Sequence, residues 1–342
     1  MNKKKILLIG AFPTDDPKTH GGTTVLVEQL HNYCQEKDII CNIIKTNIYE
    51  GKLAFFKNYL YVLFYYLKVV SKNDIIFSNV ARNGMYFLAP LLLVIAHIKG
   101  KKFVSRIFGG NSIELYNTNN KLKQYLLRYV FKQSDLLFFE TKYLVNYFKQ
   151  INKNTFWFPN TRKVSTVKRD ITHPYSKKFV YIGQIKKEKG IDELLDAFNT
   201  LDKSYQLSIY GNMIENEYAQ KFNDSHPNII YKGKIEHENV NTILSQNDIL
   251  ILPSYREGYP GVIIEAFSVG LPVIATNLAS IQEMVDSSCG ILIPPRDSAA
   301  LQRAVEAIKS KSYFELSKTA IQKFNNYKYE DVYQNIFMIL ER

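Results

Sequence analysis

Two glutamates near the end of the chain have a spacing and a setting that suit the binding of hydroxyl groups. Glu257 lies in a turn of glycine and proline after the apolar run Ile249–Leu252, and Glu265 lies in a helix expected to begin near Gly261. An ionised carboxylate only accepts hydrogen bonds, so each can bind a pair of neighbouring hydroxyls. We expect a site at the carboxyl end of a buried strand, where open α/β sheets bind anionic ligands through free amides and the helix dipole.

Two glycine-containing loops could bind phosphate at the same kind of position. In one, Gly183 and Gly190 frame a loop that contains Lys189, a cation able to pair with a phosphate. In the other, Gly21 and Gly22 follow the first expected strand and precede a helix, and glycines let a phosphate approach the backbone closely. Each feature alone also fits an ordinary turn or a solvated lysine, so their order along the chain matters more than any one of them.

Apolar runs that alternate with helical patterns predict the elements that position these residues. A chain of 342 residues is long enough for two domains, each with its own core. The alternation favours a doubly wound α/β domain in each half, and the polar, basic stretch 161–170 indicates a linker between them. We expect strands at residues 6–9, 39–44, 74–77, 102–107, 136–139 and 155–158, and then at 179–182, 206–210, 229–232, 249–252, 273–275 and 290–293.

The stretch 253–276, PSYREGYPGVIIEAFSVGLPVIAT, resembles the retaining GT-B glycosyltransferases of family 4 (glycosyl transferases group 1), which are known for an E-x7-E motif. The loop GQIKKEKG at 183–190 is similar to the same family's G-R-L-x-x-x-K-G signature. The resemblance implies a GT-B fold of two Rossmann-like domains that face a cleft, with a C-terminal helix that crosses back to the first. The implied boundaries are 1–165 for the acceptor-side domain, 166–320 for the nucleotide-sugar-binding domain and 321–342 for the returning helix.

The resemblance also implies roles for individual residues. Glu265 would accept hydrogen bonds from the ribose of a nucleotide sugar, Glu257 would bind the donor sugar, and Lys189 would pair with the diphosphate. The implied catalytic residues are Glu257, Lys189 and Arg106. The other implied donor contacts are Gly22, Gln184, Gly258, Tyr259, Gly261 and Val262, with residues 233–236 near the nucleobase, and the implied acceptor-side residues are Asn111, Glu114, Glu140 and Thr141.

Two departures from the family pattern concern the chemistry. Gln184 stands where the family usually has an arginine that binds the diphosphate, so either Lys186, Lys187 or another cation compensates or the affinity for the donor is weak. No histidine follows the expected strand 102–107, where many members have one, and His20 is the nearest substitute by loop position. Retaining transfer in this family is thought to need no protein nucleophile, because the leaving diphosphate and the incoming hydroxyl meet on one face of the sugar.

The sequence offers no candidate for a catalytic metal. It contains no D-x-D motif of the other glycosyltransferase fold, and Asp15 and Asp16 lie in a proline-flanked loop that fits turn chemistry. We therefore expect no metal, and no cofactor other than the nucleotide sugar, which is a co-substrate.

Positive charge is concentrated in the first half of the chain. Residues 1–170 hold 26 Lys and Arg against 11 Asp and Glu, a net charge of +15, whereas the remainder, with 18 against 21, carries −3. No nucleic-acid-binding motif occurs, so we expect an anionic membrane surface as the partner and no nucleic acid. The aromatic, lysine-containing stretch 53–70 fits an interfacial helix as well as a core helix, and 85–98 fits a buried helix. Neither has the apolar length to span a bilayer.

These observations lead to one function and leave two alternatives open. Three cysteines without metal spacing or a disulfide framework indicate a reducing cytosol. We expect a cytoplasmic enzyme, peripheral at the inner face of the plasma membrane, that moves a sugar from a nucleotide sugar, by default a UDP-sugar, to a lipid-linked or cell-surface polysaccharide precursor. The alternatives are a non-catalytic GT-B binding module and a sugar-nucleotide epimerase of the same fold. An NAD-dependent enzyme is excluded, because no G-x-G-x-x-G follows the first strand.

Overall fold

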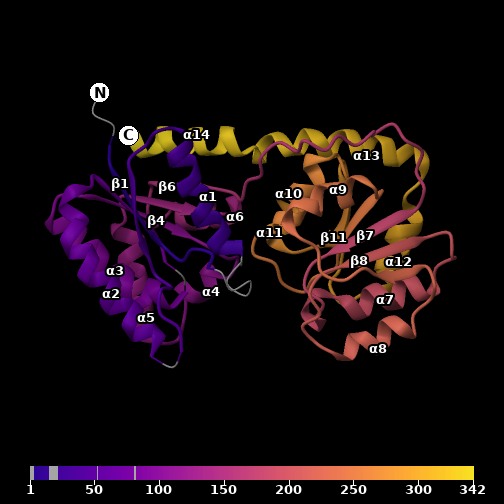
Figure 1. Cartoon of the computed structure of the whole chain (residues 1–342), viewed down its shortest axis with the longest axis horizontal. Coiled ribbons are helices and arrows are strands. Elements are labelled where there is room, and N and C mark those ends of the chain that lie inside the picture. Colours follow the sequence, from indigo (N-terminus) through magenta and orange to yellow (C-terminus); the bar gives the residue numbers. More distant parts are fainter. Residues whose placement is uncertain (1–3, 15–21, 52, 81) are drawn as a thin grey trace. The chain divides into compact units, whose positions relative to one another are not determined.

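The chain forms two compact units in the computed structural model, which describes residues 4–14, 22–51, 53–80 and 82–342. Unit 1 comprises the chain up to Pro159 together with Tyr333–Arg342, and unit 2 comprises Asn160–Val332 (Figure 1). His20, Gly21, Asp15 and Asp16, which the sequence singled out, lie outside the described residues.

Unit 1 is built on a parallel sheet of six described strands in the order β2-β1-β3-β4-β5-β6. All five residues of β1 and of β3 are buried, as expected for central parallel strands covered on both faces. The strands are β1 (Ile6–Gly10), β2 (Cys41–Lys45), β3 (Ile75–Asn79), β4 (Lys102–Ile107), β5 (Leu136–Phe139) and β6 (Thr155–Trp157). The helices are α1 (Gly22–Glu36), α2 (Ala54–Val69), α3 (Arg82–Ile98), α4 (Ser112–Tyr116), α5 (Lys121–Gln133) and α6 (Lys142–Phe148), with a 3-10 turn, η2, at Val70–Lys72.

Unit 2 has a second parallel sheet, in the order β12-β11-β10-β7-β8-β9. The strand order reverses between β7 and β10, and such a reversal is where open α/β sheets bind ligands. The strands are β7 (Lys178–Ile182), β8 (Gln206–Tyr210), β9 (Ile229–Tyr231), β10 (Ile249–Leu252), β11 (Val273–Thr276) and β12 (Gly290–Ile293). The helices are η3 (Lys187–Lys189), α7 (Ile191–Thr200), α8 (Glu217–Asn223), η4 (His237–Asn239), α9 (Val240–Ser245), α10 (Gly261–Ser268), α11 (Ala279–Gln282), α12 (Ser298–Ala307), α13 (Ser310–Lys323), η5 (Phe324–Tyr327) and α14 (Tyr329–Glu341).

The last helix returns to the first unit. α14 starts within unit 2, and its residues from Tyr333 onwards pack in unit 1. The Tyr333 ring stacks on Tyr33 of α1 at a centroid distance of 4.9 Å. At the far end of the helix, Lys102 Nζ donates to the carbonyl of Leu340 at 3.2 Å, which places a cation at the negative end of the helix dipole.

The two apolar helices of unit 1 differ in how much of their surface is covered. In α3 the buried residues Leu88, Leu92 and Ala96 belong to the core, although Ile98 is 75% exposed, so the prediction of a buried helix holds for one face only. In α2 only Asn58, Val62 and Tyr66 are buried. No helix among the described residues combines the length and the apolar character needed to cross a membrane.

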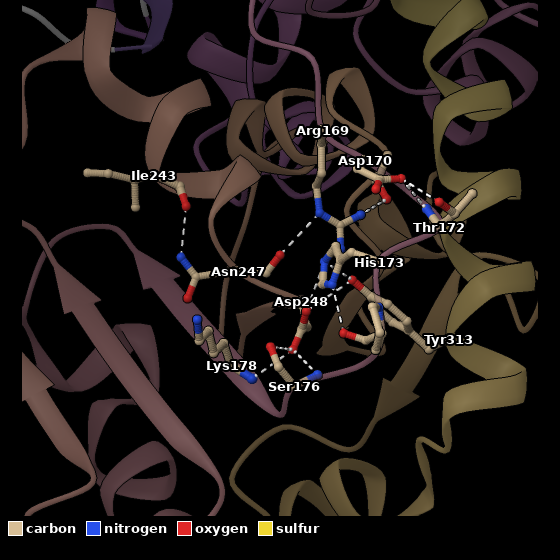
Figure 2. Close-up of polar contacts among 12 residues, drawn as sticks. Arg169, Asp170, Thr172, His173, Ser176, Lys178, Ile243, Asn247, Asp248 and Tyr313 are labelled. Atoms are coloured by element: carbon tan, nitrogen blue, oxygen red, sulfur yellow. Dashed lines mark hydrogen bonds and ion pairs between the residues drawn. The ribbon is translucent and has the colours of Figure 1, made fainter.

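The segment that leads from β6 to β7 is held to the rest of unit 2 by partly buried polar contacts. Arg169 donates from Nε to the carbonyl of Asn247 at 3.2 Å and from Nη1 to the carbonyl of Gly270 at 2.9 Å. Figure 2 shows Arg169 and Tyr313 near Asp248, and the Tyr313 hydroxyl donates to Asp248 Oδ1 at 3.1 Å. Burial lowers the pKa of Arg169 to about 10, so the guanidinium stays charged at neutral pH. The linker is therefore anchored at the end of α10.

Candidate functional site

The loops after β7 and β10 touch at the reversal point of the unit 2 sheet. Gly190 has a φ of +72°, and a Cβ at this position would stand 2.2 Å from the carbonyl oxygen of Pro253, so the close approach requires glycine. The amide of Tyr255 also donates to the carbonyl of Glu188 at 2.9 Å. Lys189 lies between Glu188 and Gly190, so these two contacts set its position relative to the turn that carries Glu257.

Lys189 and Glu257 form an ion pair at this junction. The Nζ of Lys189 lies 2.6 Å from Oε1 of Glu257, and the side chains are 22% and 12% exposed. The carbonyl of Glu257 accepts a hydrogen bond from the Ser280 hydroxyl at 3.1 Å, which holds the turn against α11. The two residues expected to bind the donor's diphosphate and sugar are thus in direct contact.

Glu265 also has a cationic partner, and it comes from the linker. Arg162 donates from Nε to Glu265 Oε1 at 2.6 Å, and the side chains are 19% and 9% exposed. His237 Nδ1 lies 3.9 Å from the same carboxylate oxygen, and its side chain is 64% exposed. The carboxylate expected to bind ribose is therefore nearly buried, and both of these neighbours lie in unit 2.

The N-terminus of α10 lies between these two carboxylates in sequence. No side chain caps the helix, and the residue in the capping position is Pro260, which has no amide of its own. Gly258, Gly261 and Val262 are partly exposed, as expected for residues proposed to contact a ligand through their main chain. Tyr259 is buried and its hydroxyl donates to the Tyr327 hydroxyl at 3.2 Å, so its expected donor contact can involve only the main chain.

The two remaining donor residues are exposed and make few contacts. Gln184 is exposed to solvent, and its main-chain carbonyl accepts a hydrogen bond from the Tyr181 hydroxyl at 2.9 Å. Gly22 is the first residue of α1, and a Cβ there would meet no atom of the described residues within 4 Å. Their donor roles stay predictions.

The loop after β9, where the nucleobase was expected, borders a hollow. The hollow has a volume of about 370 Å³, and its lining includes Tyr210, Lys234 and Asn239. The same stretch leads into His237, whose ring nitrogen Nδ1 lies 3.9 Å from Glu265 Oε1. A larger hollow, of about 450 Å³, lies beside β12, α12 and α13, and neither Glu257 nor Glu265 lines it.

Arg106, the expected catalytic residue of unit 1, lies in β4 and is only 1% exposed. Its guanidinium carbon is 3.6 Å from the centre of the Phe158 ring and 4.9 Å from that of Phe108. None of the three guanidinium nitrogens has a hydrogen-bond partner of good geometry among the described residues. Burial lowers the pKa of Arg106, while neighbouring Tyr333 and Glu140 raise it. Direct contact with a substrate requires a rearrangement, so the catalytic role stays a prediction.

The four expected acceptor-side residues fall into two groups. Glu140 and Thr141 are buried: Glu140 accepts a hydrogen bond from the Gly109 amide at 2.8 Å, and Thr141 caps α6 by accepting from the Leu144 amide at 3.1 Å. Asn111 and Glu114, at the start of α4, are exposed. In this arrangement only the second group offers side chains to a ligand. Across the described part of the chain, no three His, Cys, Asp or Glu side chains gather as metal ligands.

One residue of the site was not predicted. Arg162 lies in the basic stretch that the sequence assigned to a linker, and its partner Glu265 is 103 residues away. No local spacing connects two residues so distant, and a single arginine among several linker cations carries no signal. Its position is fixed by the backbone, because the Arg162 amide donates to the carbonyl of Tyr327 at 3.0 Å and the Arg162 carbonyl accepts from the Tyr329 amide at 2.9 Å.

Comparison with known proteins finds a family model that matches the part of the chain that carries this site. Residues 176–310 match the model of the family described as glycosyl transferases group 1. A protein of Bacillus subtilis (strain 168), provisionally named the teichuronic acid biosynthesis glycosyltransferase TuaC, is 32% identical over 127 residues, which are 37% of this chain and 31% of its own. The chain therefore matches less than a third of the length of this relative.

Solved structures establish the fold over the whole chain. Sucrose-phosphate synthase from Thermosynechococcus elongatus has a TM-score of 0.77 at 15% identity, and the match covers 99% of this chain and 98% of that one. The Anabaena protein HepE, solved in complex with UDP, has a TM-score of 0.76 at 14% identity, covering 98% and 99%. The two six-stranded parallel units are thus a GT-B fold, as predicted.

Proposed function

We propose that this protein is a retaining glycosyltransferase that moves a sugar from a nucleotide sugar to a hydroxyl of a polysaccharide precursor. The observation that carries the proposal is the pair of carboxylates, Glu257 and Glu265, at the reversal point of the unit 2 sheet, each in contact with a cation. The family match covers this part of the chain, and TuaC is named for teichuronic acid biosynthesis. HepE, a neighbour in fold, was solved with UDP bound, and UDP is accordingly the default nucleotide.

Each group in unit 2 then has a task in donor binding. Glu265 accepts hydrogen bonds from the ribose hydroxyls, while Glu257 accepts them from the donor sugar. The amides of Gly261 and Val262 at the start of α10 face the diphosphate, and Lys189 contributes a point charge beside it. No metal is assigned a role in this scheme.

Transfer follows from this arrangement without a protein nucleophile. The acceptor oxygen forms a bond to the anomeric carbon while the bond from that carbon to the diphosphate oxygen breaks on the same face of the sugar. The proton of the acceptor hydroxyl passes to the departing diphosphate, which also takes the bonding electron pair. Lys189 and the amides of α10 stabilise the negative charge that grows on the leaving group, and such electrostatic stabilisation is commonly the largest catalytic contribution.

The surface of unit 1 supports an acceptor carried by a membrane. Phe56, Leu60 and Phe64 of α2 are 62%, 52% and 54% exposed, and Lys68 Nζ lies 3.8 Å from the centre of the Phe64 ring. Aromatic side chains interleaved with lysines suit the interface of an anionic bilayer. We therefore assign the protein to the cytoplasmic face of the plasma membrane, with a lipid-linked saccharide as acceptor.

The test is product analysis with a panel of UDP- and GDP-sugars, with and without membrane extract as the source of acceptor. Wild-type protein should transfer sugar with the anomeric configuration of the donor retained, and Glu265→Gln should abolish most of the activity. Inverted product would refute the retaining mechanism. Conversion of the donor in the absence of acceptor would instead indicate an epimerase, and a protein that binds none of the nucleotides would be a binding module.

A further inference from the structure

The ion pair between Arg162 and Glu265 occupies two parts of the proposed donor site at once. Besides its contact with Glu265, the guanidinium lies against the first residue of α10, since a Cβ on Gly261 would stand 2.1 Å from Arg162 Nη2. Arg162 Nη1 donates to the carbonyl of Thr161 at 2.8 Å, and Nη2 makes no hydrogen bond to the described residues. One guanidinium edge is thus bound to the carboxylate while another atom lies at the uncapped start of the helix.

The charges of this pair are those that a nucleoside diphosphate would attract separately. A carboxylate binds ribose hydroxyls, and a guanidinium binds phosphate oxygens through parallel N–H donors. Paired as they are, the two groups neutralise each other, so neither is left as an uncompensated, mostly buried charge. A ligand that carries both a ribose and a diphosphate can replace both halves of the pair, whereas a nucleoside can replace only one.

Gln184 is the reason why a cation at the position of Arg162 matters for binding the diphosphate. The loop after β7 presents a neutral amide at the position where the resemblance leads one to expect a cation, and the Gln184 side chain is exposed. Lys189 is already paired with Glu257. The same loop also holds Lys186, which pairs with Glu188 at 3.5 Å, and Lys187. Arg162 is a further cation, and it is mostly buried at the start of α10, where the diphosphate is proposed to bind.

We infer that Arg162 is a donor-binding residue that changes partner: it pairs with Glu265 as described and moves to the diphosphate when the nucleotide sugar binds, which frees Glu265 for the ribose. This inference rests on the proposed function and names the group that replaces the missing arginine. It makes the site selective for nucleoside diphosphates over nucleosides, because only a diphosphate compensates Arg162 for the loss of its carboxylate.

Arg169 provides a matched control from the same linker. It too is a largely buried arginine, but it donates to main-chain carbonyls at the other end of α10, beside Gly270. Its replacement should lower the stability of unit 2 without altering the preference for diphosphates. A purely structural role for Arg162 would give the same result as Arg169.

The experiment is calorimetric titration of the full chain with UDP and uridine, and in parallel with GDP and guanosine. Arg162→Ala should weaken binding of the diphosphate by about tenfold or more, the effect of losing charge-assisted hydrogen bonds. The same variant should bind the nucleoside as tightly as the wild type or more tightly, because Glu265 is no longer held. Arg162→Lys, which keeps the charge but lacks the planar fork, should lie between the two, and it serves as the test if Arg162→Ala does not fold.

Two results would overturn the inference, and they are distinguishable. If wild type binds the diphosphate and Arg162→Ala shifts diphosphate and nucleoside affinity by the same factor, as Arg169→Ala is expected to do, the pair is only structural. If wild-type protein binds neither UDP nor GDP, the donor site itself is wrong and the inference falls with it.

Discussion

At the carboxyl ends of the strands, the two units differ in whether their buried charged side chains are hydrogen-bonded to partners of opposite charge. In unit 2 each of the two motif carboxylates contacts a cation, at 2.6 Å in both cases. In unit 1 the prominent charge is Arg106, which is buried among aromatic rings and has no hydrogen-bond partner of good geometry in the described residues. Unit 2 thus compensates each of its two motif carboxylates with a cation, whereas burying the Arg106 guanidinium in unit 1 costs free energy that no hydrogen bond among the described residues offsets.

The largest effect should come from breaking an ion pair of unit 2. Lys189→Ala removes the charge proposed to stabilise the leaving diphosphate, so we expect transfer to fall by about 10²–10³-fold, the usual cost of removing one preorganised stabilising group. Initial rates with a saturating donor measure it. Lys221→Ala is the matched control, because Lys221 is also paired, with Asp192 at 2.8 Å, but lies on α8. Equal losses in the two variants would show that the effect is not specific to the edge.

The second effect concerns the contact that brings Lys189 to Glu257. Gly190→Ala imposes a strained positive φ and a clash with the Pro253 carbonyl, so we expect a loss of unfolding free energy of about 3 kcal/mol. Gly233→Ala has a similar φ, +80°, but open space around the Cβ, and should cost only about 1 kcal/mol. Urea denaturation of both variants measures the difference. Similar losses would mean that the loop contact is looser than described.

The third effect concerns the buried guanidinium of Arg106 in unit 1. Arg106→Met keeps the length of the side chain and removes a buried charge that has no hydrogen-bond partner of good geometry among the described residues, so stability should stay the same or rise, by up to about 2 kcal/mol. Transfer should nevertheless fall if Arg106 serves the reaction. A loss of about 3 kcal/mol or more in urea denaturation would instead reveal that Arg106 has a strong partner in solution.

The smallest effect concerns the exposed face of α2. Replacing Phe56 and Phe64 together by serine should weaken co-sedimentation with anionic liposomes by about tenfold, because part of the binding energy is apolar. Binding of the wild type should also weaken as salt rises, since charge attraction is screened within about 10 Å at 0.1 M salt. Neutral vesicles are the control. Wild-type protein that ignores anionic vesicles at low salt would point to a soluble acceptor.

Much of the fold could be predicted from the sequence. The described strands lie within about two residues of the expected ranges, because central parallel strands need continuous apolar runs and glycines mark where such runs end. The exposure of α2 could not be predicted. Its residues are as apolar as those of a core helix, and only packing decides that Val62 is buried while Leu60 is half exposed.

The candidate site likewise contains residues that the sequence predicts and residues that only the fold reveals. Glu257, Glu265 and Lys189 could be named in advance because a recognisable motif surrounds each of them. The partners of those residues were harder to predict from the sequence, because Arg162 reaches Glu265 only through the path that the linker takes. The burial of Arg106, Glu140 and Thr141 also depends on tertiary packing, which local spacing does not encode.

The central claim is that the reversal point of the unit 2 sheet binds the nucleotide of a sugar donor. A crystal structure of the full chain with UDP, or with GDP if calorimetry favours it, tests this most directly. We predict ribose hydroxyls within about 3 Å of the Glu265 carboxylate and a diphosphate in contact with Lys189 and the start of α10. A nucleotide bound elsewhere, or one that leaves Glu265 without a contact to the ribose, would contradict the account.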